Sequence, residues 1–496
     1  MVIFSLTFPD NCDILVRKKG WYSVKLKKIA LLSAFLLALT SCSGEAVELM
    51  SFLDQSAGVD YEGYNCYYLE RQNGFYDSNK HILTYDKNTL QGEAFLKRID
   101  DIKKSVNVNV VFDHTYDEDS YQKAALSDLI TADLVSMYYM NAMQVLSSGG
   151  LLYPIEDFPE YIDLTETDKY GGANVLEPAM IDSVPYAVQP LYWPGYQTTD
   201  NLVLVSNTDM LSANGITNFH EFYENKTWTW ETFENELLKK FRVENSDGLV
   251  PALSVKESEF FDMMIYSNNV QFVTKNEAGE NVTNLMPQSF VTAYDKTLEW
   301  LTTYDNIDSD NKWVDVSDFL NESAATTLAQ GALVTTGGIA YKESSFSYNI
   351  MPFPSGPDAP YGKWANFVMS MRGIGISKAS KEPNIAAHTL SLLLEPFEEF
   401  GGKGGLIDFY KETVFLSSTD AEIFFDIMDD VRYDYTFWNQ SDVGREMACK
   451  FGESAKNGIS LSEAFDRHRN QLETMVYKYI LPNYDYMYEN YYYQFE

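Results

Sequence analysis

Residues suited to metal binding or nucleophilic chemistry are few in this chain and widely spaced. Its 496 residues include four cysteines and five histidines, and these form no C-x-x-C or H-x-x-x-H pair. Zinc sites draw on such clustered ligands, so we predict neither a metal centre nor any other cofactor. Cys66 and Cys449 could form a disulfide, but two buried free thiols are the favoured interpretation.

Aromatic rings are the more promising chemical groups. They make up 15% of the chain, with 35 tyrosines and 8 tryptophans. Flat rings can pack against the C–H faces of a sugar, while planar amides and carboxylates pair with neighbouring hydroxyls. Such side chains on loops that follow strands are therefore candidates for holding a polyhydroxylated ligand.

The N-terminal region carries an export signal. Lys25, Lys27 and Lys28 precede an apolar run over residues 29–39, and small residues then lead to Cys42. The run is far shorter than the ~20 residues of a spanning helix, and the pattern is that of a secretory signal. It resembles the lipobox of bacterial lipoproteins, which implies cleavage before Cys42 and diacylglycerol on its thiol. A plain signal peptide with an incidental cysteine is the alternative.

Residues 1–23 do not suit the start of such a signal, because Asp10 and Asp13 fall within them. We expect translation to begin at Val24, which would place the lysines at the N-terminus. The predicted layout is a signal peptide over 1–41 and a lipid-anchored flexible linker over 42–63.

The mature chain is strongly acidic. Residues 1–41 hold six basic and two acidic residues, so 31 Lys and Arg remain against 70 Asp and Glu, a formal charge of −39. This balance excludes nucleic acid as a partner, because phosphate binding needs clustered cations. The mature length also exceeds a single core, which predicts two or more domains.

Strands and helices alternate in the first part of the mature chain. Strands are predicted at 64–69, 106–112 and 133–137, and helices at 90–102 and 121–130. This alternation is typical of a parallel α/β sheet.

The middle of the chain and its C-terminal part contain longer helices. Thr229 is a good N-cap for an apolar helix face running to Phe241, and Pro287 opens another helix. Ser460 to Glu463 form a capping box. Trp228 and Trp230 are predicted to be packing residues. The glycines at 401–405 lack the phosphate-loop spacing and predict a flexible turn, and the acidic residues at 308–312 predict solvated surface.

A series of short landmarks resembles the extracellular solute-binding proteins (family 1) that serve ABC sugar importers, the class of the maltose-binding protein. Residues 132–135 and 150–154 resemble its first-lobe strand and "G-L-L-x-P-L" run, and 184–188 with 202–207 resemble its crossing. Residues 226–233 match its "T-W-x-E-F" helix start, 348–354 its "I-M-P-x-P" strand, 373–377 its return strand and 380–394 the next helix. The resemblance covers nearly the whole mature chain.

This resemblance implies a two-lobed periplasmic-binding-protein fold of type II, with a ligand cleft between α/β lobes joined by hinge strands. Lobe 1 would comprise 64–200 and about 363–398, and lobe 2 would comprise 201–362 and about 399–496. It also implies a small-molecule ligand of the sugar class, the membrane subunits of an ABC permease as partners, and a place on the outer face of the cell membrane.

The residues that could contact the ligand follow from the same comparison, and several lie in an insertion at 189–200 that departs from the family pattern. They are Tyr138, Tyr139, Asn141, Gln189, Tyr192, Trp193, Tyr341, Trp364, Asn366, Asp434, Tyr435 and Trp438. Pro190 and Pro194 stiffen the segment around Trp193.

Two other functions are compatible with the composition. A secreted glycoside hydrolase needs two carboxylates across a cleft, and the many acids of this chain could supply them, but no acid stands in an enzyme-like motif. A surface adhesin or scaffold would lack a closing cleft. The binding protein, with no enzymatic activity, is the preferred interpretation.

Overall fold

The computed structural model describes most of the chain between residues 58 and 484. It covers residues 58–69, 76–77, 82–83, 90–113, 118–127, 129, 131–138, 150–170, 176, 179–181, 184–189, 199–246, 248–311, 315–331, 334, 345–364, 368–397, 400–413, 415, 417–429 and 442–484. All of them belong to the second of two compact units, Ser56–Glu496, and the first unit is Met1–Gln55.

The first group of strands is built mainly from the N-terminal part of this unit. β1 (Tyr64–Leu69) lies between β4 (Val108–Asp113) and β5 (Leu134–Tyr138), and all three are parallel. The long β18 (Val368–Ser377) returns antiparallel beside β5 and also pairs with β6 (Leu152–Tyr153).

The second group repeats this arrangement with later strands. β12 (Leu253–Ser254) lies between β15 (Ile307–Asp308) and β16 (Thr326–Gln330), again all parallel. β9 (Thr199–Asn207) runs antiparallel beside β16 and also pairs with β17 (Tyr348–Met351). In each group, therefore, an antiparallel strand lies beside three parallel strands whose middle member comes first in the chain.

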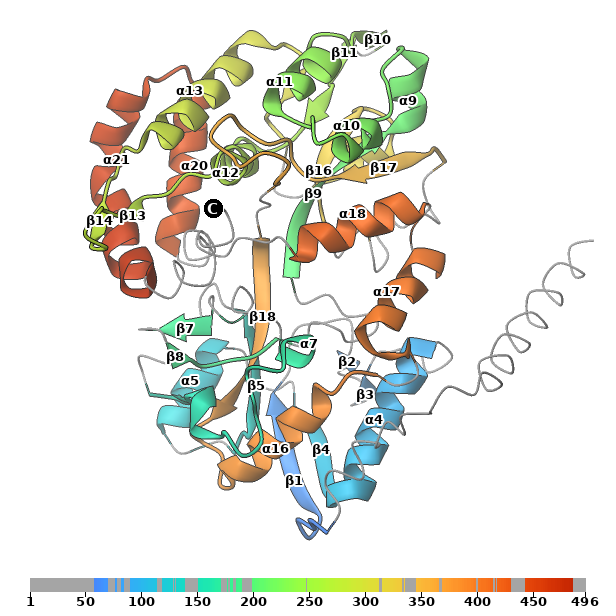
Figure 1. Ribbon diagram of the computed structural model, residues 1–496, viewed down its shortest axis with the longest axis vertical. Coiled ribbons are helices and arrows are strands. Elements are labelled where there is room, and N and C mark those ends of the chain that lie inside the picture. The colour runs from blue at the N-terminus through green and yellow to red at the C-terminus, as the bar shows by residue number, and fades with distance from the viewer. Residues whose placement is uncertain are drawn as a thin grey trace, which may run out of the picture. The chain divides into compact units, whose positions relative to one another are not determined.

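β9 and β18 connect the two groups. Residues 199–201 of β9 pair antiparallel with residues 368–371 of β18, with a register shift between Val368 and Ser370. The remainder of β9 belongs to the second group, and the remainder of β18 to the first. The predicted mixed α/β fold with connecting strands is confirmed (Figure 1).

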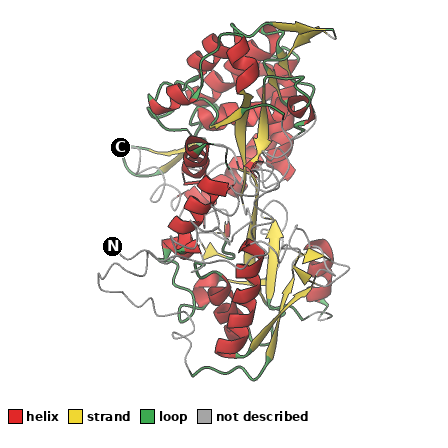
Figure 2. Cartoon of the chain, turned by 90° about the vertical axis from the view of Figure 1, so that its right-hand side faces the viewer, coloured by secondary structure: helices red, strands yellow, loops and turns green. Residues whose placement is uncertain are grey.

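Helices flank the strands in both views (Figures 1 and 2). The helices α12 (Glu257–Ser267), α13 (Gln288–Thr303), α20 (Asp442–Lys456) and α21 (Leu461–Met475) pack against one another. The other helices are α4 (Leu90–Val106), α5 (Glu118–Leu126), α7 (Thr167–Tyr170), α9 (Thr208–Ala213), α10 (His220–Glu224), α11 (Trp230–Phe233), α14 (Ser317–Leu320), α16 (Pro383–Leu393), α17 (Gly402–Thr413) and α18 (Ser418–Asp429).

The remaining elements are short. The helical turns are η1 (Ile155–Asp157), η3 (Glu234–Leu238), η5 (Val476–Ile480) and η6 (Leu481–Asn483). The hairpins are β2 (Tyr76–Asp77) with β3 (Ile82–Leu83), β7 (Met180–Ile181) with β8 (Val184–Pro185), β10 (Val243–Asn245) with β11 (Gly248–Val250), and β13 (Val273–Lys275) with β14 (Asn281–Thr283).

Several predicted boundaries are wrong, and the helix predicted at 121–130 spans Glu118–Leu126. Val106 ends α4 rather than opening a strand, because Asn107 has a φ of 55° and its N–H donates to the carbonyl of Lys103 at 3.0 Å. Asn tolerates this left-handed conformation, which ends a helix. The glycines at 401–405 are also not a free turn, since Gly402 begins α17. A Cβ on Gly405 would come within 1.3 Å of the Phe400 carbonyl, so glycine permits a close backbone approach there.

Aromatic side chains fill the core beside the second group of strands. Trp228 and Trp230 are 0% and 3% exposed, which confirms their packing role. The rings of Phe261 and Phe451 stack at 5.8 Å and join α12 to α20. Cys66 and Cys449 are free, as predicted, although Cys449 is only half-buried.

Candidate ligand-binding site

The carboxyl ends of the parallel strands are the expected location of a ligand site. In open α/β sheets, ligands bind beyond these ends, where neighbouring loops diverge. Tyr138 is the last residue of β5 and pairs with Arg372 of β18, so it lies at this edge of the first group. Tyr139 and Asn141, which follow it, lie outside the described residues.

Most of the other predicted contacts also fall outside the described residues. They are Tyr192, Trp193, Tyr341, Asn366, Asp434, Tyr435 and Trp438, together with the predicted lipidation site Cys42. Ligand contact by these residues and lipidation of Cys42 therefore remain predictions.

Gln189 lies beside the strand that returns to the first group. It follows Val188, which forms an isolated antiparallel bridge with Ile374 of β18, and its side chain is 0% exposed. Gln189 thus stands where the chain leaves the first group, at the start of the predicted insertion.

Trp364 lies against α10. Its indole N–H donates to the Trp228 carbonyl at 2.8 Å, and its ring stacks on Tyr223 with centroids 4.5 Å apart. The side chain is 8% exposed. These contacts account for its position through packing and fix the chain just before β18.

The second group presents polar residues at its own carboxyl edge, which the sequence prediction treated as plain surface. Asn311 donates to Ser254 Oγ at 3.0 Å, and Ser254 Oγ donates to Asp318 at 3.4 Å. Ser254 ends β12, and Asn311 follows shortly after β15. Knowledge of which short strands are neighbours was needed to find this cluster.

The same edge is fixed by the end of α20. Lys456 Nζ donates to the Ser309 carbonyl at 3.0 Å and pairs with Asp310. Asp310 is 86% exposed, but Ser309 is buried, so the solvated surface predicted for 308–312 holds for Asp310 and not for its neighbour. Among the described residues, no group of three or more His, Cys, Asp or Glu could hold a metal ion.

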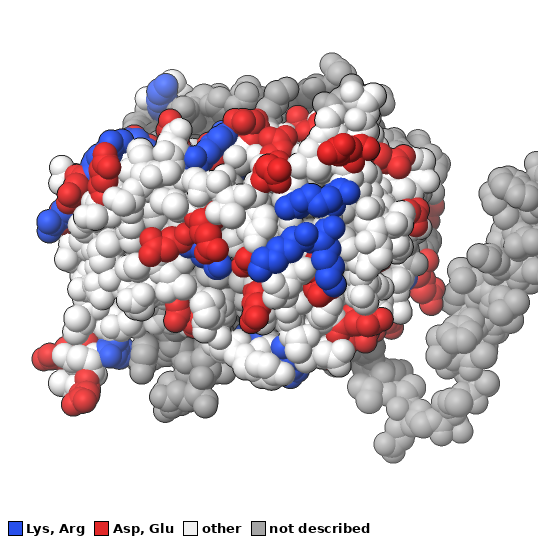
Figure 3. Space-filling model, turned by 90° about the horizontal axis from the view of Figure 1, so that it is seen from above, with Lys and Arg blue, Asp and Glu red and all other residues white. Residues whose placement is uncertain are grey.

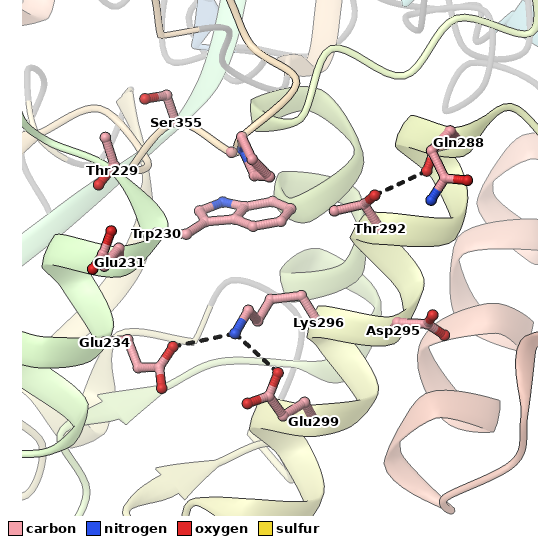
Figure 4. A pocket seen from close by; sticks show the side chains of 12 residues that line it. Thr229, Trp230, Glu231, Glu234, Gln288, Thr292, Asp295, Lys296, Glu299 and Ser355 are labelled. Atoms are coloured by element: carbon pink, nitrogen blue, oxygen red, sulfur yellow. Dashed lines mark hydrogen bonds and ion pairs between the residues drawn. The ribbon is translucent and has the colours of Figure 1, made fainter.

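A separate cavity of about 640 Å³ lies between α11 and α13. Its twelve lining residues come from the start of α11 and η3, from one face of α13 and from the loop after β17 (Figure 4). They are Thr229, Trp230, Glu231, Glu234, Gln288, Thr292, Asp295, Lys296, Glu299, Ser355, Gly356 and Pro357.

Glu234 organises the charge at one side of this cavity. It accepts hydrogen bonds from Tyr304 at 2.6 Å and from Trp300 and Lys296 at 3.2 Å each, and it pairs with Lys239 at 3.0 Å. Partial burial alone would raise the pKa of Glu234, but these donors outweigh it and lower the pKa to about 2. Glu234 is therefore a fixed anion at neutral pH.

Lys296 is held between two carboxylates. Its ammonium donates to Glu299 at 2.9 Å as well as to Glu234 (Figure 4). Partial burial opposes the charged form, but the two acids prevail and raise the pKa of Lys296. The cavity thus contains one permanently charged lysine.

The repeated strand order and its two connecting strands define the class of two-lobed solute-binding proteins. A family model described as bacterial extracellular solute-binding protein matches residues 97–395, more than half of the chain, and the chain belongs to this family. Comparison with curated proteins gives no sequence match.

Solved structures support the same fold at low sequence identity. An ABC substrate-binding protein from Listeria monocytogenes in complex with cycloalternan is 13% identical, with a TM-score of 0.55, covering 84% of this chain and 98% of its own. The sugar-binding protein MalE from Xanthomonas citri is 15% identical, with a TM-score of 0.57 and coverages of 84% and 98%. UgpB from Mycobacterium tuberculosis, in complex with glycerophosphocholine, is 15% identical, with a TM-score of 0.54 and coverages of 79% and 96%.

Within the described ranges, no helix is both long and apolar enough to span a membrane.

Proposed function

We propose that this chain is the lipid-anchored, extracellular binding component of an ABC importer and that it captures a mono- or oligosaccharide. The observation that carries the proposal is the strand order, which occurs twice and is connected by β9 and β18. The chain also belongs to the solute-binding family. Similar structures are described with maltose, maltotetraose and cycloalternan, which supports a carbohydrate.

The proposed ligand site lies between the carboxyl edges of the two strand groups. Its proposed contacts are the residues predicted from the sequence other than Trp364, whose ring packs on Tyr223. Aromatic rings would meet the C–H faces of the sugar, and amides and one carboxylate would pair with its hydroxyls. Tyr138 supports this assignment because it ends β5 at the edge where α/β sheets bind ligands.

Capture would proceed by hinge bending. Two extended segments, β9 and β18, are the natural hinges because each is shared between the groups, and hinges are formed by a few residues that absorb backbone rotation. A ligand that contacts both edges would stabilise the closed form by its differential affinity for that form.

The lipid on Cys42 would keep the binding domain next to its permease. A tether raises the local concentration of a binder at its partner without strengthening any contact. The acidic body would contribute no membrane attraction of its own to an anionic surface, so the anchor would hold the protein there.

Binding assays on the mature chain test the proposal. We expect maltose, maltotetraose or cycloalternan to raise the melting temperature and to be recovered unchanged, because a ligand that binds only the folded state stabilises it. Glycerophosphocholine serves as the phosphate-bearing alternative. Hydrolysis of a bound oligosaccharide, measured by chromatography, would show a glycoside hydrolase instead. Failure of a broad sugar library to bind would overturn the carbohydrate assignment.

A further inference from the structure

The cavity between α11 and α13 has preformed walls. The backbone N–H of Trp230 donates to the Ser355 carbonyl at 2.9 Å, which ties the start of α11 to the loop after β17. The buried Asn268 donates to the Asp358 carboxylate at 2.9 Å and accepts from the Asp358 N–H at 3.1 Å. Hydrogen bonds at Ser355 and at Asp358 therefore fix the loop on both sides of the residues that line the cavity.

Two hydroxyl groups of this cavity, those of Thr292 and Ser355, have already committed their hydrogens. Thr292 Oγ1 donates to the Gln288 carbonyl at 3.0 Å (Figure 4), and Ser355 Oγ donates to the Trp228 carbonyl at 3.2 Å. Each oxygen keeps free lone pairs, so both groups act toward a ligand as acceptors. Toward these two oxygens a ligand must supply donors.

The charge of the cavity points to the same kind of ligand. Four carboxylates against one ammonium, that of Lys296, leave the lining with a formal charge of −3. Glu234 is saturated by its donors, whereas Glu231 and Asp295 are exposed and make no hydrogen bond or ion pair with other described side chains. Figure 4 shows these two acids on different walls, Glu231 on α11 and Asp295 on α13.

The ammonium group of Lys296 already lies in the lining of this cavity. Lys296 Nζ lies 5.7 Å from the centroid of the Trp300 ring while it pairs with two acids, so the site accommodates an ammonium group. The face of the molecule seen in Figure 3 carries acidic side chains interspersed with groups of lysines and arginines.

We propose that this cavity is a second ligand site, distinct from the carboxyl edges, and that it binds an organic cation with two primary ammonium groups. Its volume of about 640 Å³ falls within the usual range of small-molecule pockets. Acceptors on two walls suit a ligand with a donor at each end and an apolar stem between them. This inference does not depend on carbohydrate capture, because the lining comes only from residues 229–357.

Titration calorimetry with 1,4-diaminobutane on the mature chain tests this site. The neutral isostere 1,4-butanediol controls for shape. Butylamine, with one ammonium, tests the need for two. Glu231→Gln and Asp295→Asn each remove one free acid, and Glu277→Gln on the β13–β14 turn removes the same charge away from the cavity. Melting temperatures establish that each variant is folded.

The expected result is saturable binding of the diamine, weakened about 3- to 10-fold by each cavity variant and unchanged by Glu277→Gln. Binding should also weaken at higher salt, because the acids at the rim are exposed. Equal binding of 1,4-butanediol, an affinity unchanged in the Glu231→Gln/Asp295→Asn double variant, or no heat at about 10 mM diamine would overturn the proposal. Sugar binding measured on the same samples keeps this outcome separate from the proposed function.

Discussion

Val188 and Ile374 exchange two backbone hydrogen bonds: Val188 N–H donates to Ile374 O at 3.1 Å, and Ile374 N–H donates to Val188 O at 2.7 Å. Both side chains are buried. The segment that leaves the first strand group is thereby fastened to β18, the strand that returns to it. We expect rotation between the groups to occur on the β9 side of this bridge.

Trp193 is the most direct test of the proposed sugar site, because it lies in the insertion that follows this bridge. Trp193→Ala should weaken sugar binding about 10-fold or more, since buried aromatic contacts dominate small interfaces. Calorimetry measures the effect. Tyr361→Ala is a suitable control, because Tyr361 is an 80% exposed aromatic residue outside the predicted set. Equal affinity in Trp193→Ala and the unaltered protein would remove Trp193 from the site.

Cys42→Ser tests the anchor. The variant should lose incorporation of labelled fatty acid and should appear in the soluble fraction of cells, because the hydroxyl cannot form the thioether that carries the lipid. Its sugar affinity after purification should match that of the mature protein. If the variant still carried labelled lipid, Cys42 would not be the lipidated residue.

The sequence predicted the order of elements more accurately than their contacts. Alternating apolar runs such as 64–69 and 133–137 are local signals, and the parallel α/β arrangement follows from them. The pairing of Ser254 with Asn311 depends instead on which two-residue strands are neighbours. The cavity at Trp230 was missed for a related reason: its walls come from segments far apart in the chain, and only the burial of Trp230 could be predicted.

Arg98 shows how a buried charge joins α4 to the C-terminal end of α16. Its guanidinium donates to the Leu392 and Leu393 carbonyls at the end of α16 and to the Glu395 and Pro396 carbonyls just after it, at 2.6 to 3.2 Å. It also lies 4.2 Å from the centroid of the Phe397 ring. A helix C-terminus leaves such carbonyls without partners, and a cation there complements the helix dipole.

Arg98→Ala should therefore lower the free energy of unfolding by about 3 kcal/mol, because it leaves several buried carbonyls without donors. Arg98→Lys should be intermediate, since one ammonium cannot reproduce the planar fork. Urea unfolding of the mature chain measures both. Lys97→Ala is the matched control, because Lys97 is 55% exposed and its pair with Asp101 contributes little. A loss below about 1 kcal/mol for Arg98→Ala would contradict this role.

Glu234 should make stability dependent on acid pH. Its folded pKa of about 2 lies below the ordinary value of 4.5, so its contribution is present above pH ~5 and is lost as the pH falls toward 2. The shift corresponds to about 2 to 3 kcal/mol for this largely buried carboxylate. Glu234→Gln should lower stability at pH 7 and flatten its decline between pH 5 and pH 2. Glu299→Gln, at a 51% exposed acid, should leave that decline nearly as it is.

Gly356 and Asn268 provide a test of the loop that closes the second cavity. A Cβ on Gly356 would lie 2.2 Å from Asn268 Oδ1, so Gly356→Ala must displace the amide that holds Asp358. We expect Gly356→Ala to cost about 2 kcal/mol of stability, typical of overpacking. Asn268→Ala removes the clashing amide together with its hydrogen bonds. In that background, Gly356→Ala should cost about 1 kcal/mol less than in the unaltered protein, because the two changes act on one contact. Additive losses in urea unfolding would show that the clash does not act through Asn268.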